Sequence, residues 1–193
     1  MKYIVITLVF VCILPIGAFG EQTAPVTCDV YWGMTFEQVK IEKENATEVL
    51  VEILQALGYP EKAGIDKVLY QTIVVFNEPA EILYYFKDDS LISVIYIFEK
   101  LDPEITEYIF KSLISIFDDK YIIDKKSSGG ESEKKYFNDI TNIKLRMYDD
   151  EAKIVLEYTE SNYHKQERER YHHERKDVIE QFKQKWSQDL SKF

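Results

Sequence analysis

Histidine, cysteine and glycine are scarce in this 193-residue chain, which has three histidines, two cysteines and seven glycines. The side chains that most often serve as general bases, nucleophiles and metal ligands are therefore few. The sequence also lacks the short motifs of serine hydrolases, zinc proteases, thiol oxidoreductases and phosphate-binding loops. We therefore expect no catalytic residues, no metal site and no cofactor, and we predict that the protein is not an enzyme.

Positive charge is also in short supply, because 24 lysines and arginines face 34 aspartates and glutamates, giving a net charge of −10. Nucleic acids and anionic membrane surfaces attract basic patches, so neither is an expected partner of this acidic protein. The aromatic content of 14% is high for so charged a chain. It indicates a folded core rather than disorder.

The longest hydrophobic run is confined to the first twenty residues. Lys2 is followed by apolar residues 3–16 and then by small residues up to Gly20. This order predicts a signal peptide over residues 1–20, cleaved after Gly20; the alternative is an uncleaved membrane anchor. We expect an exported protein, periplasmic or secreted, without a stable membrane anchor. Loss of Lys2 would change the net charge from −10 to −11.

Cleavage would leave Cys28 as the only cysteine. A single cysteine cannot form an intramolecular disulfide, so the stability of the fold must come from burial of apolar side chains. We expect Cys28 to be a small buried side chain, and an intermolecular disulfide or a reactive thiol is the alternative.

Hydrophobic periodicity predicts an α+β fold in which an antiparallel sheet packs on helices. The run 91–98 is apolar on both faces of a strand, so this strand should be central and covered on both sides. Thr35 and Asp102 have the positions of helix caps. Strands are expected at 68–76, 81–87, 91–98 and in a hairpin over 142–159, and helices at 35–41, 46–57 and 103–119, the last burying Ile105, Ile109, Leu113 and Ile116.

The domain is expected to span residues 21–161, with a mobile polar loop at about 125–135 between its halves. A faint repeat crosses this loop at a constant offset of 62 residues. It indicates either a duplicated helix-plus-hairpin module or the general likeness of two hairpins. The repeat consists of Phe86, Ile92 and Tyr96, matched by Tyr148, Ile154 and Tyr158.

Residues 162–193 are predicted to form a long, charged, amphipathic C-terminal helix. Its apolar residues lie at helical spacing and form a candidate docking stripe. We expect the stripe to fold back over the second face of the sheet, because an exposed aromatic stripe lowers solubility; the alternative is contact with another protein. The stripe consists of Val178, Phe182, Trp186, Leu190 and Phe193.

Acidic pairs and histidines offer weaker candidates for chemistry. The pairs Asp88-Asp89, Asp118-Asp119 and Asp149-Asp150 lie at expected turns or helix ends, where aspartate is common for backbone reasons alone. The three histidines all lie in the charged C-terminal segment, between arginines that oppose a bound cation. A solvated, salt-bridged helix is the preferred interpretation. These histidines are His164, His172 and His173, with Glu169 nearby.

The segment Trp32-Gly33-Met34-Thr35-Phe36-Glu37-Gln38-Val39 resembles a W-G-M-[ST]-x-E-x-V motif of small exported bacterial proteins of unknown function. More distantly, it is similar to the N-terminal motif of SmpA/OmlA-like outer-membrane assembly lipoproteins and of β-lactamase-inhibitor-like modules. The resemblance implies helices packed on a small antiparallel sheet, a bacterial envelope protein, and a candidate motif of Trp32, Gly33 and Met34. The chain lacks the lipidation cysteine of the former group and the paired cysteines of the latter.

Taken together, these patterns predict an exported non-enzymatic protein that acts as a protein-interaction or envelope accessory module, with another protein as its partner. Two alternatives remain. One is a carrier of a small apolar ligand held between the sheet and the C-terminal helix, with Tyr84, Tyr96 and Phe182 lining an enclosed cavity. The other is a hydrolase whose site is assembled from dispersed carboxylates in one cleft.

Overall fold

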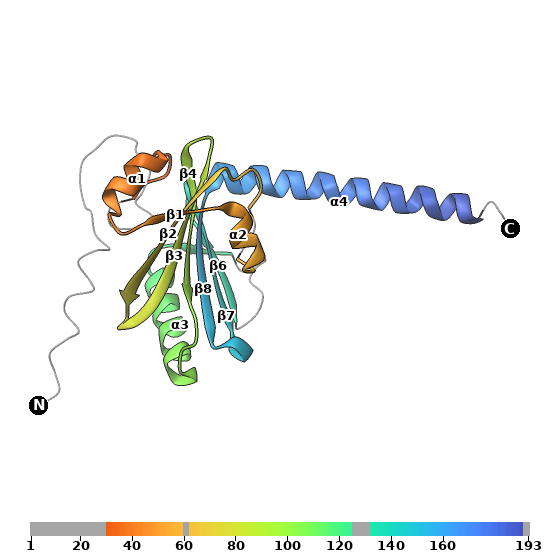
Figure 1. Ribbon diagram of the computed structural model, residues 1–193. Helices are drawn as coiled ribbons and strands as arrows, with labels where there is room; N and C mark the ends of the chain where they lie inside the picture. The colour runs from red at the N-terminus through yellow and green to blue at the C-terminus, as the bar shows by residue number, and fades with distance from the viewer. Residues whose placement is uncertain (1–29, 60–61, 125–131, 191–193) are drawn as a thin grey trace, which may run out of the picture.

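The computed structural model describes residues 30–59, 62–124 and 132–190, without some of the side chains in the C-terminal helix. It contains an eight-stranded antiparallel sheet with helices packed against it, so the α+β prediction is confirmed (Figure 1). The elements are α1 (Phe36–Glu42), β1 (Thr47–Val49), α2 (Val51–Ala56), β2 (Lys67–Val75), β3 (Glu78–Lys87), β4 (Ser90–Phe98), α3 (Pro103–Asp118), β5 (Ile122–Ile123), β6 (Glu133–Phe137), β7 (Thr141–Tyr148), the 3₁₀ turn η2 (Asp149–Glu151), β8 (Lys153–Glu160) and α4 (Ser161–Leu190).

The strand order β1-β2-β3-β4-β8-β7-β6-β5 is symmetric about the contact between β4 and β8. In each half one helix, α1 or α3, precedes four strands. Across the central contact Val94 pairs with Tyr158, and Tyr96 pairs with Leu156. Adding 62 to the residue number takes Val94 to Leu156 and Tyr96 to Tyr158. The β4 residue of each pair is therefore matched with the β8 residue of the other pair. The offset found in the sequence is therefore the offset that relates β4 to β8 in the sheet.

One face of the sheet, called here the helix face, is covered by α1 over the first half and by α3 over the second. Phe36 and Val39 of α1 pack with Tyr84 and Phe86 of β3. The strand β4 is central and buried on both faces, as predicted. The cluster under α3 contains Ala80, Phe98, Leu101, Ile109, Phe110, Leu113, Phe117, Tyr136, Ile143, Leu145, Ile154 and Leu156.

Both predicted helix caps are confirmed. The Thr35 hydroxyl accepts a hydrogen bond from the Gln38 amide at 3.2 Å, and the Gln38 side chain accepts one from the Thr35 amide at 2.8 Å, which completes a capping box. The Asp102 carboxylate accepts from the Glu104 amide at 2.9 Å ahead of Pro103. These caps satisfy amides that the first turns of α1 and α3 would otherwise leave unpaired.

The buried face of α3 differs from the predicted one. Ile105 is exposed, whereas Phe110 and Phe117 are buried together with Ile109 and Leu113. Phe117 packs edge-on against Tyr158 with ring centroids 6.2 Å apart. The side chains of Phe110 and Phe117 bury more area than an isoleucine side chain does. The helix therefore packs on the sheet through the face that carries these two residues.

One further sequence prediction is wrong. The expected helix at 46–57 begins instead with β1, because the β-branched Thr47 and Val49 pair with the edge of β2, and α2 starts only at Val51. The expected loop at 125–135 lies outside the described residues except at its end, where Glu133 to Lys135 belong to β6. Their alternating side chains suit a strand that pairs with β7.

The opposite face of the sheet, called here the open face, is covered over its first half by α2 and by residues 57–59 and 62–66. Leu54 and Val51 of α2 pack there with Val68, Leu83 and Ile95. The contact between Lys62 and Glu157 extends this cover to β8. Over β6 and β7, no described element covers this face beyond the first turn of α4. Figure 1 shows α4 running away from the sheet.

The two halves are also joined by a buried hydrogen bond. The Trp32 Nε1 donates to the Thr141 Oγ1 at 2.9 Å, linking the segment before α1 to the start of β7. We expect Trp32→Phe and Thr141→Val each to lower the free energy of unfolding by about 1–2 kcal/mol, because each leaves a buried partner without its bond. The free energy of unfolding of the double variant should fall by less than the sum of the two single losses. Urea unfolding of the unchanged protein, the two single variants and the double variant measures these losses. Strictly additive losses would contradict the prediction.

Candidate functional site

A groove of about 410 Å³ lies on the open face of the sheet. Its floor contains Ile97 of β4 and Val155 of β8, and one wall is formed by Leu57 and Tyr59 after α2. The volume falls within the range of small-molecule and peptide sites. The remaining lining residues are Gly58, Glu99, Arg146, Tyr148, Glu151, Lys153 and Glu157, so an apolar floor is surrounded by charges of both signs.

Glu157, which lines the groove, forms a buried ion pair with Lys62, which lies outside the groove lining. The Lys62 Nζ lies 2.5 Å from Glu157 Oε1, and only 5% of the Lys62 side chain is exposed. Burial raises the pKa of Glu157, but the Lys62 charge and hydrogen bond, together with Arg146, outweigh it and hold this pKa below the usual glutamate range. Glu157 is therefore ionised at neutral pH, and it fixes the segment after α2 onto β8.

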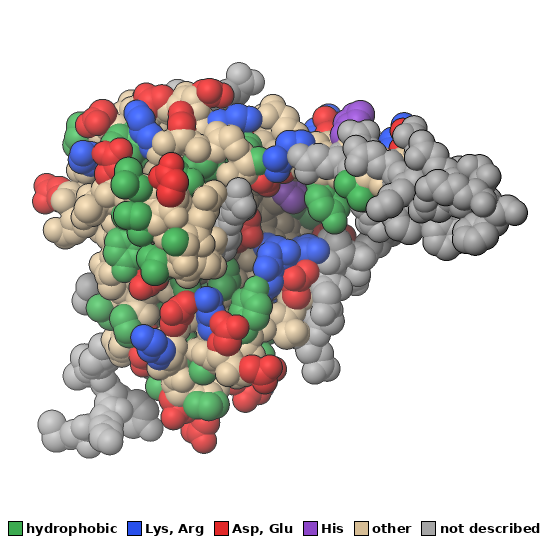
Figure 2. All heavy atoms as spheres, turned by 45° about the vertical axis from the view of Figure 1, so that its right-hand side comes forward, with side chains coloured by type: hydrophobic (Ala, Val, Ile, Leu, Met, Phe, Trp, Pro, Cys, Tyr) green, Lys and Arg blue, Asp and Glu red, His purple; other side chains and the backbone are tan. Residues whose placement is uncertain are grey.

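Beside this pair, three cations share a single carboxylate. The Glu133 side chain lies 3.1 Å from Lys135, 3.6 Å from Lys144 and 3.3 Å from the Arg146 Nε, which is not oriented to donate a hydrogen bond to it. Burial and the charge of Arg146 lower the pKa of Lys144. Figure 2 shows lysine and arginine side chains beside a hollow below the base of α4. This part of an acidic protein therefore carries a local excess of positive charge.

The other carboxylates of the groove are also paired. The Lys153 Nζ lies 2.7 Å from Glu99 and 3.9 Å from Glu151. The Tyr59 hydroxyl donates to Glu81 at 2.5 Å. Burial and the neighbouring Glu81 raise the pKa of Tyr59, so this hydroxyl keeps its proton at neutral pH. The arrangement provides hydrogen bonds and ion pairs at the groove.

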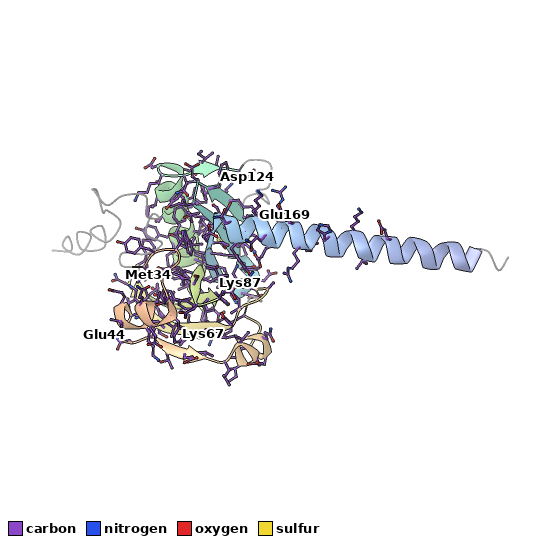
Figure 3. The ribbon with its side chains drawn as sticks, turned by 90° about the horizontal axis from the view of Figure 1, so that it is seen from above. Met34, Glu44, Lys67, Lys87, Asp124 and Glu169 are labelled. Carbon is purple, nitrogen blue, oxygen red and sulfur yellow. The ribbon has the colours of Figure 1, made fainter. Side chains whose placement is uncertain are left out.

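The first turn of α4 is held against the segment after α2, outside the groove lining. The buried Tyr163 places its hydroxyl 2.9 Å from both the Ala63 carbonyl and the Glu167 carboxylate, and Lys87 lies over its ring. Figure 3 shows Lys87 near the base of the helix. Tyr163 therefore anchors α4 to the segment that carries Lys62.

The predicted docking stripe of α4 does not cover the sheet at its first member, because Val178 is 64% exposed. Val178 thus departs from the expectation that the stripe folds back on its own domain, and the expectation for the other four members stays a prediction. The described part of the open face near α4 is charged, so it offers an apolar stripe little to pack against. The side chains of Phe182, Trp186 and Leu190, and the whole of Phe193, lie outside what the structure describes.

The Trp32-Gly33-Met34 motif has a structural role in the described fold. The Gly33 amide donates to the Leu91 carbonyl at 3.1 Å, and the Leu91 amide donates to the Met34 carbonyl at 2.9 Å. Gly33 has a φ of 82°, a conformation that suits glycine best. Together with the bond from Trp32 to Thr141, these contacts fix the N-terminal segment to the starts of β4 and β7.

The residues proposed to line a ligand cavity do not form one in the described part of the chain. Tyr84 is buried in the core, where its hydroxyl donates to Gln71 at 3.2 Å. Tyr96 packs edge-on against Tyr158 with ring centroids 6.0 Å apart. Neither lines the groove.

The acidic pairs lie in turns or at helix ends, as expected. Asp88 and Asp89 form the turn between β3 and β4 with positive φ angles, Asp118-Asp119 ends α3, and Asp149-Asp150 lies in η2. Among the described residues, no group of three or more histidine, cysteine or acidic side chains is arranged to hold a metal ion. Within the same residues, no helix combines the length and apolar character needed to cross a membrane.

Sequence analysis missed the groove. Lys144, Arg146 and Glu157 alternate with apolar residues in the final hairpin, a pattern typical of a strand with one polar face. Tyr59 lines the groove and Lys62 bonds Glu157, but both come from a connection almost a hundred residues earlier, and no local pattern predicts that they meet this hairpin.

Comparisons with protein families, curated proteins and solved structures gave no match to this chain. The assignment of function therefore depends on the geometry of the site.

Removal of the Glu157 charge should destabilise the fold. We expect Glu157→Gln to lower the free energy of unfolding at pH 7 by about 3 kcal/mol or more, because it leaves Lys62 buried without a counter-charge. Because the folded pKa of Glu157 is lowered, its contribution is present above the ordinary glutamate pKa of about 4.3 and is lost as the pH falls through the folded pKa. The difference between the two proteins should therefore shrink below about pH 4.

Denaturant unfolding from pH 3 to pH 8 measures this difference. The matched control is Glu107→Gln, which breaks an exposed pair with Lys111 on α3 and should change stability little. A pH-independent difference for Glu157→Gln would contradict the role given to its charge.

Proposed function

We propose that this protein is an exported, non-enzymatic interaction module that binds another protein at the groove of the open face. The observation that carries the proposal is an exposed apolar ridge that borders the groove, next to the part of the open face that no described element covers. The ridge consists of Leu50, Ile53 and Leu57, which are 64%, 48% and 67% exposed. Leu57 also lines the groove, so the two surfaces are continuous.

This combination matches the anatomy of a protein-binding surface. Apolar side chains at the centre of an interface gain free energy by leaving water, and surrounding charges select the partner. The ridge supplies the apolar side chains, and Arg146, Lys153 and Glu99 at the groove supply the charges that would select a partner. A single groove lined by both signs of charge suits a polypeptide better than a small apolar ligand.

The state of the carboxylates supports a non-enzymatic role. General acid catalysis by a carboxyl group needs a raised pKa, whereas the pKa of Glu157 is lowered by Lys62 and Arg146. Glu99 is held in an ion pair with Lys153. The cleft does bring together carboxylates from separate segments, as a hydrolase would, but they are matched with cations.

Export and an envelope role form the second part of the proposal. Support comes from the signal-like residues 1–20 and from the resemblance of the Trp32-Gly33-Met34 segment to small exported bacterial proteins. The symmetric strand order agrees with a duplicated helix-and-strand module of the kind expected from the 62-residue offset.

Cleavage of the signal can be measured directly. When the full chain is expressed in a bacterium, we expect the mature protein to begin at Glu21 and to be released from the periplasm by osmotic shock. Intact mass measurement of the released and membrane-bound fractions checks this. A protein that retains residues 1–20 in the membrane fraction would contradict the cleaved form and favour an anchored one.

The binding surface can be tested with a photo-crosslinking amino acid in the full chain. Placed at Leu57, it should give a discrete adduct with one partner in the cell envelope. The matched control is Ile41 on α1, which is 71% exposed but lies away from the groove. Arg146→Glu combined with the Leu57 probe should abolish the adduct. Equal adducts from both positions, or an adduct insensitive to the Arg146 change, would contradict the proposal.

A further inference from the structure

The outer edge of β2 is only partly paired. The strand β1 pairs with residues Val68 to Tyr70, and no described residue pairs with Gln71 to Val75 on the side away from β3. Figure 1 shows this end of the β2–β3 hairpin at the margin of the sheet. Unpaired strand edges are templates for pairing with another chain.

The turn at the end of β2 determines which backbone groups face outward. Phe76 and Asn77 have φ angles of 55° and 63°, as in a two-residue hairpin turn, so the flanking Val75 and Glu78 exchange hydrogen bonds with each other. The next pair, formed by Val74 and Pro79, does not exchange such bonds, in agreement with the missing amide of proline. The amide and carbonyl of Val74 therefore point away from β3.

By the same alternation, the amide and carbonyl of Thr72 also point outward. Thr72 and Val74 have exposed side chains, and Val74 is 73% exposed. Between them, Ile73 packs partly into the core, and Val75 and Phe76 pack against the cluster under α3. The edge is thus held in an extended form with its hydrogen-bonding groups unpaired.

This edge lacks the usual protection against self-association. Natural edge strands carry charges, prolines or bulges that oppose pairing with a second chain. The ten residues from Val68 to Asn77 contain no charged side chain and no proline, in a protein of net charge −10. Two copies of this strand can therefore be placed side by side without opposing like charges.

We propose that a second copy of this chain pairs with the free edge of β2 in antiparallel fashion, centred on Ile73. In this register Thr72 of each copy faces Val74 of the other, and each such pair exchanges two hydrogen bonds, giving four in all. The contact is self-complementary, as a two-fold dimer requires. It joins the two sheets at the edge of β2, whereas the floor of the groove lies on β4 and β8, and the dimer does not depend on the function proposed above.

The test uses the full mature chain and two substitutions at one exposed position. Val74→Pro removes the outward amide of this residue. It breaks no hydrogen bond to β3, because Val74 and the facing Pro79 exchange none. Val74→Ala keeps the amide and is the matched control. Sedimentation across a range of concentrations should show a monomer–dimer equilibrium for the unchanged protein. The dimer should be at least about tenfold weaker with Val74→Pro and within about threefold of the unchanged protein with Val74→Ala.

Hydrogen–deuterium exchange gives a second readout that needs no variant. The amides of Thr72 and Val74 should be protected at high protein concentration and should lose protection on dilution, while those of Ile73 and Val75, which bond to β3, and those of β4 and β8 stay protected. Retained protection of β4 and β8 in Val74→Pro would also show that this variant is folded. A monomer at every concentration, a dimer unaffected by Val74→Pro, or exchange at Thr72 and Val74 that does not depend on concentration would each overturn the proposal.

Discussion

The pairing of β4 with β8 is the contact on which the rest of the structure depends, because it is the seam between the two halves of the sheet. The pair of Ile95 and Glu157 lies at the centre of the symmetric register. On the helix face, Tyr96 and Tyr158 pack across the seam. With Cys28 the only cysteine outside the predicted signal, the two halves must be held by strand pairing and apolar burial.

The same seam explains why the two halves have different surfaces. Ile95 is fully buried beneath α2, whereas its symmetric counterpart Glu157 faces the groove and pairs with Lys62. Once α2 covers the first half, that half must be apolar. Over β6 and β7 the second half has no such cover among the described residues, so it can hold charges. The two halves of the sheet thus present different surfaces.

Sequence patterns predicted the strands and caps well because these depend on neighbouring residues. The alternation in 142–159 and the cap at Asp102 are local, and both are confirmed. The errors occur where distant contacts decide the outcome. Thr47 and Val49 form a strand because the edge of β2 is present, and the buried face of α3 is set by Phe110 and Phe117 meeting the sheet. The groove depends on Lys62 meeting Glu157, a contact that periodicity cannot encode.

The departure of α4 from the sheet follows from the same distribution of surfaces. The helix face is already occupied by α1 over one half and by α3 over the other, so no apolar surface remains there for a third helix. The open face next to the start of α4 carries Lys144, Arg146 and Glu133, and burying these charges under an apolar stripe would cost free energy. The first turn of the helix is attached to the domain at Tyr163, and Val178 remains exposed to solvent.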